Sequence, residues 1–89
     1  MARLPKEYIE PIKILIPWFL ETYCHNDFQK VYLKRALDKI YCSNDVDLTS
    51  AELCEVRDCT ATATNNISEC GVDKELVWSI WKWACNTQA

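Results

Sequence analysis

Residues 5–24 have the sequence PKEYIEPIKILIPWFLETYC, and this stretch decides the fold. Its polar positions recur at steps of three and four residues and form one stripe: Lys6, Glu10, Lys13, Pro17 and Glu21. This spacing predicts a helix over the whole stretch with apolar side chains on its other faces. Such a helix needs other helices around it, so we expect it in the centre of the core. Because Pro11 and Pro17 can each occupy the first turn of a helix, we expect a kink at Pro17 or a split into two shorter helices.

Two further helices are predicted on either side of a polar turn at 43–45. Asp27 is the predicted N-cap of a helix over 28–42. The inward face of that helix is expected to consist of Tyr32, Leu33, Ala36, Leu37 and Ile40. After the turn, Thr49 and Glu52 have the spacing of a capping box, which predicts a helix that ends near Thr60. The small, polar residues that follow carry no clear signal.

Val72, Asp73 and Val77 have the spacing of a hydrophobic staple around an N-cap. This spacing predicts the last helix, over 74–85. Its inward side is expected to consist of Leu76, Val77, Ile80, Trp81, Trp83 and Ala84. The chain contains a single glycine, whereas hairpins and bulges depend on glycine for positive φ angles. We therefore predict an all-α fold. It is one small bundle of four to five short helices over residues 1–89, with a frayed tail at 86–89.

Cysteine content far exceeds ordinary usage for a chain of 89 residues. The six cysteines are Cys24, Cys42, Cys54, Cys59, Cys70 and Cys85. Small domains with little core recruit disulfides in oxidising compartments, so we expect three cross-links and a secreted, extracellular protein in its mature form. The favoured pairing joins Cys24 to Cys85, Cys42 to Cys54 and Cys59 to Cys70. The first residues lack the apolar run of a secretory leader, which keeps an intracellular location as the alternative.

Neither a metal, nor a cofactor, nor catalysis is expected. Cys54 and Cys59 have four residues between them, but no second pair follows, and on a helix the two lie on separate faces. His25 is the only histidine and is expected to be solvated at a helix end. No acid–base pair or nucleophile elbow is visible. The acidic residues that recur every three positions are expected to form a solvated helix face: Glu52, Glu55 and Asp58.

Trp78 marks the candidate binding site. It projects from the flank of the last predicted helix, with Lys74 and Lys82 four residues away on either side. Exposed tryptophan beside positive charge is typical of the residues that dominate protein interfaces. We therefore predict a non-enzymatic protein that recognises a protein partner, such as a receptor or host protein, and acts as a signal, toxin or effector. No small-molecule substrate is indicated.

A helix-turn-helix over residues 62–83 is the first alternative function. The sequence NISECGV at 66–72, followed by two inward aliphatic residues, resembles the spacing of helix-turn-helix proteins. The residues presented to DNA bases would be Asp73, Lys74, Glu75 and Trp78. Residues 43–89 carry eight acidic and three basic side chains, whereas residues 1–42 carry five acidic and seven basic side chains. Attraction to phosphate dominates affinity for nucleic acid, so a nucleic-acid partner is not expected.

A membrane-interface helix over residues 5–24 is the second alternative. The segment combines Trp18 and Phe19 with many aliphatic residues, as interfacial helices do. Its polar stripe contains Glu10 and Glu21 beside the lysines, and a central core helix explains the same pattern without lipid. Core burial is therefore the expectation. No apolar run approaches the roughly 20 residues needed to span a bilayer.

Overall fold

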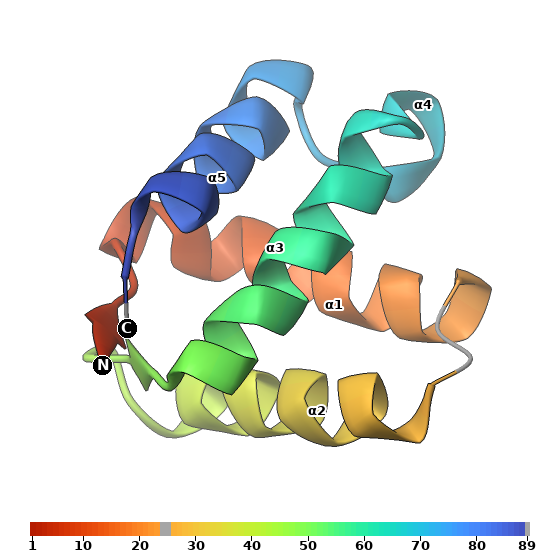
Figure 1. Cartoon of the computed structure of the whole chain (residues 1–89). Coiled ribbons are helices and arrows are strands. Elements are labelled where there is room, and N and C mark those ends of the chain that lie inside the picture. Colours follow the sequence, from red (N-terminus) through yellow and green to blue (C-terminus); the bar gives the residue numbers. More distant parts are fainter. Residues whose placement is uncertain (24–25, 89) are drawn as a thin grey trace.

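Helices make up most of the molecule in the computed structural model, which describes residues 1–23 and 26–88 (Figure 1). The described elements follow in this order: β1 (Ala2–Arg3), the 3-10 turn η1 (Lys6–Tyr8), α1 (Ile9–Thr22), α2 (Asp27–Cys42), β2 (Asp47–Leu48), α3 (Ser50–Thr64), α4 (Ile67–Cys70) and α5 (Lys74–Asn86). The predicted all-α class is confirmed, because the described part forms a small bundle of five helices.

α1 lies in the middle of the bundle, as the apolar stretch predicts. It contacts α2, α3 and α4, and Figure 1 shows it crossing between α2 and the upper half of the molecule. Its buried side chains are Ile9, Pro11, Ile12, Leu15, Ile16 and Phe19. The predicted split is wrong, since α1 runs without interruption through Pro17. Pro17 lies on the polar stripe, so the Lys13 carbonyl that loses its N–H donor is on the solvent side of the helix.

α2 covers one side of α1 with most of the predicted inward face. Leu33, Ala36 and Ile40 are buried, and Leu37 packs against the same core, whereas Tyr32 is only half-buried and lies outside the core cluster. The N-cap is one residue earlier than expected, because the Asn26 side chain accepts a hydrogen bond from the backbone N–H of Phe28 at 2.8 Å. Asp27 is therefore the first helical residue, where its negative charge suits the positive end of the helix dipole.

α3 begins at the predicted capping box and ends later than predicted. The Thr49 hydroxyl accepts from the Glu52 N–H at 3.2 Å, and the Glu52 carboxylate accepts from the Thr49 N–H at 2.8 Å. The helix continues to Thr64 instead of Thr60. Its threonine side chains turn back onto the helix and donate hydroxyl hydrogen bonds to backbone carbonyl oxygens three or four residues earlier, which satisfies the hydroxyl groups within the helix.

The corner between α4 and α5 uses the single glycine of the chain. Gly71 ends α4 with a φ of 77°, a left-handed conformation that other residues adopt at a cost. Asp73 caps α5 as predicted, since its side chain accepts from the Glu75 N–H at 3.2 Å. Val72 packs against the core and Val77 is buried, as the staple requires. α5 packs mainly on α3, and Trp81 is only half-buried although it was expected on the inward side.

Two short strands tie the N-terminus to the loop before α3. Ala2 pairs with Leu48 and Arg3 pairs with Asp47 in antiparallel register. The Arg3 guanidinium donates to both carboxylate oxygens of Asp47, at 2.8 and 3.2 Å, which holds the pKa of that carboxyl below its usual value. Leu4 continues the contact, because its N–H donates to the Val46 carbonyl at 2.8 Å. Strands of two residues are too short to show a periodic pattern, so they could not be predicted from the sequence.

One buried ion pair joins α2, β2 and α3. Glu52 has 1% of its surface exposed, and its Oε1 accepts from the Lys39 ammonium at 2.6 Å as well as from Thr49. Lys39 also donates to the Asp47 carbonyl at 3.0 Å. Burial by itself would raise the pKa of Glu52, but the hydrogen bonds from Lys39 and Thr49 outweigh burial and hold the pKa below its ordinary value. Glu52 is therefore a structural anion, and the predicted solvated position is wrong.

The cysteines do not cross-link the described part of the chain. No disulfide joins any two of Cys42, Cys54, Cys59, Cys70 and Cys85. The favoured pairs Cys42–Cys54 and Cys59–Cys70 are thus wrong, and the pair Cys24–Cys85 lies partly outside the described residues. Cys59 and Cys70 are buried in the core, where each thiol lies 3.6 Å from a backbone carbonyl oxygen, of Leu15 and Ile67 respectively. Burial in the core is ordinary for these two residues, since cysteine is among the most frequently buried residues.

Breaking the buried ion pair is expected to destabilise the fold from either side. Lys39→Met leaves an uncompensated buried carboxylate, and the free energy of unfolding should fall by about 3 kcal/mol. Glu52→Gln keeps an acceptor for Thr49 but removes the charge, and the expected loss is about 1–2 kcal/mol. The double variant should lose less than the sum of the two, since each single change already removes the pair. Urea unfolding at pH 7 measures all three.

The pH dependence provides an independent check of the same pair. The folded-state pKa of Glu52 is lower than the unfolded-state value, so the unfolded chain binds more protons between the two. Its stabilisation is complete above the ordinary glutamate pKa and disappears as the pH falls through the folded-state value. Glu52→Gln should remove this part of the acid destabilisation. Glu10→Gln, which removes an exposed pair with Lys13, is the control and should change stability by less than about 0.5 kcal/mol. Equal effects of the two variants would contradict the assignment.

Thiol reactivity tests the cysteine assignment. In protein isolated without reductant, iodoacetamide should label the exposed Cys42, Cys54 and Cys85 under native conditions. Cys70 is buried and should be labelled only after unfolding. Peptide mass spectrometry locates the labels. If labelling of the three exposed cysteines required prior reduction, they would be disulfide-bonded and the assignment would be wrong.

Candidate functional site

The residues predicted to bind a partner lie together on the outer side of α5. Lys74, Trp78 and Lys82 are all exposed, and 37% of the Trp78 surface is accessible. Trp81 stands edge-on to Trp78, with ring centroids 5.5 Å apart and an angle of 85° between the ring planes. We call Lys74, Trp78, Trp81 and Lys82 the α5 surface. Trp81 was missed as a member because its position in the sequence also fits the inward side.

The lysines of the α5 surface do not stack their ammonium groups on the indole. Among the described residues, cations stacked on rings are Lys13 over Tyr41 and Arg35 over Tyr32, and neither lies on α5. Lys74 and Lys82 therefore lie one turn to either side of Trp78 without an ammonium–ring contact to it in the described structure. The α5 surface offers a partly exposed indole that contacts a second ring and has an exposed lysine on either side.

The acidic series on α3 is not the solvated face that the spacing predicts. Asp58 is exposed, but Glu52 is buried in the ion pair described above and Glu55 is half-buried. Glu55 Oε2 is buried and accepts no hydrogen bond within the described part. Burial raises the pKa of Glu55, an interaction with Gln29 opposes this in part, and the nearby Asp58 charge raises the pKa further. The pKa of Glu55 is thus raised, whereas the pKa of Glu52, one turn earlier on α3, is lowered.

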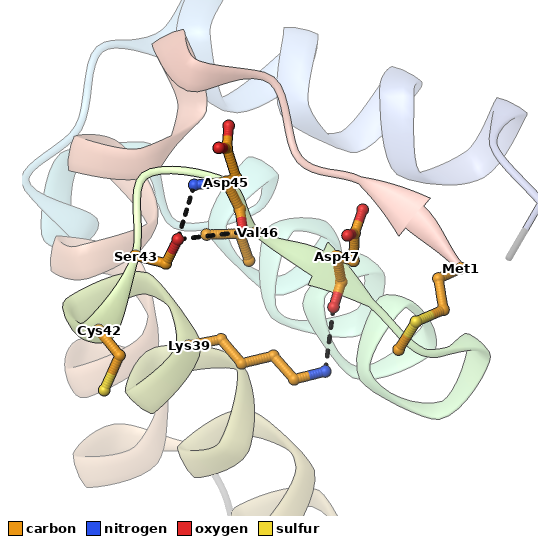
Figure 2. A pocket seen from close by; sticks show the side chains of 7 residues that line it. All are labelled: Met1, Lys39, Cys42, Ser43, Asp45, Val46 and Asp47. Atoms are coloured by element: carbon orange, nitrogen blue, oxygen red, sulfur yellow. Dashed lines mark hydrogen bonds between the residues drawn. The ribbon is translucent and has the colours of Figure 1, made fainter.

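A pocket of about 380 Å³ lies where α2 ends and the two strands begin (Figure 2). Its lining consists of Met1, Lys39, Cys42, Ser43, Asp45, Val46 and Asp47. Figure 2 shows the Lys39 side chain extending along the pocket to the Asp47 carbonyl oxygen. The charged groups already have partners: Lys39 binds Glu52, and Arg3 lies 2.8 Å from Asp47 and 3.5 Å from Asp45. Paired charges of this kind stabilise the fold and are poorly suited to proton transfer.

The helix-turn-helix alternative meets an unfavourable charge at the start of α5. The corner at Gly71 exists, but α4 contains only four residues. Asp73 and Glu75 are exposed beside Lys74. A duplex approaching this end of α5 meets two carboxylates for one ammonium, and phosphate contacts supply most of the affinity of DNA-binding proteins.

The apolar face of α1 is used by the core, which leaves little of it for a lipid surface. Ile12, Leu15, Ile16 and Phe19 are buried, and Trp18 packs against the same cluster. The expectation of core burial is confirmed for these residues. Across residues 1–23 and 26–88, no helix combines the length and the apolar character that crossing a membrane requires.

Sequence reasoning missed an apolar strip on the solvent side of α2. Phe28 and Val31 are 76% and 46% exposed, and Arg35 follows one turn later, stacked on Tyr32 at 5.5 Å. The signal was present, because positions 28, 31 and 35 lie opposite the inward face at helical spacing. The strip sits far along α2 from the pocket of Figure 2, at the end where the helix begins.

Metal-binding chemistry is not visible in the described part of the chain: no group of three or more His, Cys, Asp or Glu side chains there converges as ligands would. The predictions for Cys24 and His25 lie outside the described residues. Comparisons of this chain with protein-family models, with curated proteins and with solved structures gave no match. The chemistry of its own surface is therefore the guide to its function.

Removing the charge of Glu55 is expected to stabilise the protein at neutral pH. The folded-state pKa of Glu55 is raised, so the folded protein binds more protons than the unfolded chain, and stability falls as the pH rises through that range. Glu55→Gln removes the cost of burying the charge, and the free energy of unfolding at pH 7 should rise by about 1 kcal/mol. Asp58→Asn is the matched control on the exposed side of α3 and should change stability by less than about 0.5 kcal/mol. A loss of stability in Glu55→Gln would show that the carboxylate has a partner that matters.

Proposed function

We propose that this domain is a non-enzymatic protein-binding module that recognises its partner through the α5 surface. The observation that carries the proposal is the setting of Trp78: a partly exposed indole, braced edge-on by Trp81 at 5.5 Å, between two exposed lysines. Tryptophan is the residue most enriched among those that dominate binding energy in protein interfaces. A signal, toxin or effector that acts through a partner would need a surface of this kind.

The energetics of the indole support this proposal. A tryptophan side chain buries about 150–250 Å² when fully covered, so covering the exposed third of Trp78 contributes on the order of 2 kcal/mol. The contact with Trp81 restricts the ring before binding, which reduces the entropy lost on association. α5 itself is fixed by its N-cap and by its packing on α3. The surface is therefore rigid where binding energy is expected to concentrate.

The charges specify the kind of partner. Lys74 and Lys82 lie one helical turn to either side of Trp78, so a complementary surface carries an apolar or aromatic pocket with carboxylates at its rim. The same recognition operates for a secreted protein and for an intracellular one, because burial of an indole drives association in either compartment. The proposal therefore stands apart from the oxidation state of the cysteines.

Substitution of Trp78 is expected to separate binding from stability. Wild-type protein carrying a photo-crosslinker at position 79, in place of the exposed serine, should capture a partner that mass spectrometry identifies. With the purified partner, Trp78→Ala should weaken binding about 30-fold, and Lys74→Ala or Lys82→Ala about threefold each. Trp78→Ala should stay folded and lose less stability than a variant of a tryptophan in the core, because more than a third of its surface is exposed in the folded protein.

Two controls sharpen this experiment. Trp83 packs against the core and meets Tyr8 at 6.0 Å, so Trp83→Ala should reduce stability by about 3 kcal/mol. Asp38→Ala, on the exposed side of α2, should leave binding and stability unchanged. The proposal is wrong if Trp78→Ala unfolds the protein as Trp83→Ala does, or if the folded variant binds the partner as tightly as the wild type. Salt-dependent binding of duplex DNA at the same surface would favour the helix-turn-helix alternative instead.

A further inference from the structure

A second concave surface lies between α1 and the turn that leads into α5. This groove has a volume of about 330 Å³, and its apolar lining is formed by Pro11, Ile14, Val72 and Leu76. Ile14 is 49% exposed there, although it belongs to the most apolar helix of the chain. Large aliphatic side chains left open in a concave surface are typical of binding sites for an apolar group.

Carboxylates surround this apolar lining. Glu7 and Glu10 come from η1 and α1, and Asp73 comes from the N-cap of α5. All three side chains are exposed. Glu10 forms an ion pair with Lys13 at 3.1 Å, whereas Glu7 and Asp73 have no ion-pair partner among the described residues. The groove thus has an apolar floor and a rim with uncompensated negative charge.

Gly71 lies beside the floor of the groove. A Cβ atom at this position would be in ordinary van der Waals contact with Cγ2 of Ile14, at 3.8 Å. The residue needs its φ of 77° for the corner between α4 and α5. This corner brings Val72 and Asp73 to the edge of the groove.

We propose that this groove binds a basic segment of another protein, which inserts a leucine or isoleucine side chain against Ile14 and Leu76 and places lysine or arginine beside Glu7 and Asp73. Charge complementarity selects this occupant, because a neutral or acidic segment would leave the two carboxylates without a partner at the edge of a dry contact. The volume fits one or two side chains and not a folded surface.

The groove is separate from the α5 surface. Leu76 and Trp78 are two residues apart on α5, which places them on nearly opposite sides of the helix. The two surfaces also have opposite charge, with lysines around Trp78 and carboxylates around Ile14. This inference therefore does not depend on the α5 surface being a binding site.

Three peptides with the same length and blocked ends test the groove: acetyl-KKLLKK-amide, acetyl-EELLEE-amide and acetyl-KKSSKK-amide. The readout is methyl NMR of Ile14, Val72 and Leu76. Only the first peptide should shift these methyl signals in a saturable way, with a dissociation constant of about 0.1–1 mM, as expected for a short flexible ligand. Raising the salt concentration should weaken the binding, since the ion pairs at the rim are exposed.

Charge-matched variants provide the decisive comparison. Glu7→Gln together with Asp73→Asn should weaken binding of acetyl-KKLLKK-amide about tenfold, and asparagine keeps the N-cap of α5. Glu21→Gln together with Asp38→Asn removes the same net charge elsewhere and should leave the affinity unchanged. Trp78→Ala should also leave it unchanged. Unchanged partner binding in Trp78→Ala, together with unchanged peptide binding, would thus count against the α5 surface and not against the groove.

Several outcomes overturn the proposal. Equal weakening in both charge-matched pairs would show attraction to net charge rather than binding in the groove. Equal shifts with acetyl-EELLEE-amide would remove the role of the rim. If dilution of the protein alone moved the Ile14 methyl signal and Phe28→Ser abolished that change, the occupant would be a second copy, held through the basic, apolar strip of α2.

Discussion

The Glu52 carboxylate is the point on which the rest of the structure depends. It caps α3 through Thr49 and holds Lys39 of α2, and Lys39 in turn fixes the Asp47 carbonyl in the strand β2. β2 pairs with β1, so Glu52 also positions the N-terminal residues indirectly. A buried ion pair is costly to desolvate, and removal of one partner leaves an uncompensated buried charge. Here it sets the relative placement of two helices and a strand with a single side chain.

Helix signals in this sequence are local, and most of them could be predicted for that reason. The capping box at Thr49, the N-cap at Asp73 and the inward face of α2 each depend on residues within one or two turns. The burial of Glu52 could not be predicted, because it depends on Lys39, thirteen positions earlier and on another helix. The same holds for the strands, whose pairing spans 44 positions and leaves no periodic pattern.

The cysteines show how composition misleads when it is separated from location. Cysteine is frequent in this chain, but Cys59 and Cys70 lie in the core as small apolar side chains. The candidate site shows the reverse case: Trp78 could be placed on an open flank from helical spacing, whereas its brace by Trp81 could not, since position 81 suits either side of α5. The groove beside Ile14 was beyond sequence reasoning, because its walls come from segments some sixty positions apart and the spacing within each says nothing of the other.

The pairing of β1 with β2 has a consequence for synthesis of the chain. The first strand finds its partner only after residue 48 has left the ribosome, and synthesis of the intervening residues takes seconds, whereas a helix forms within about a microsecond. α3 ends at Thr64, later still, so α1 lacks the cover of α3 until those residues have also been made. Within residues 1–89, the most apolar helix is thus made before the helices that cover it. Folding in the cell therefore depends on how fast the later helices are synthesised, or on a chaperone that binds α1 until they are.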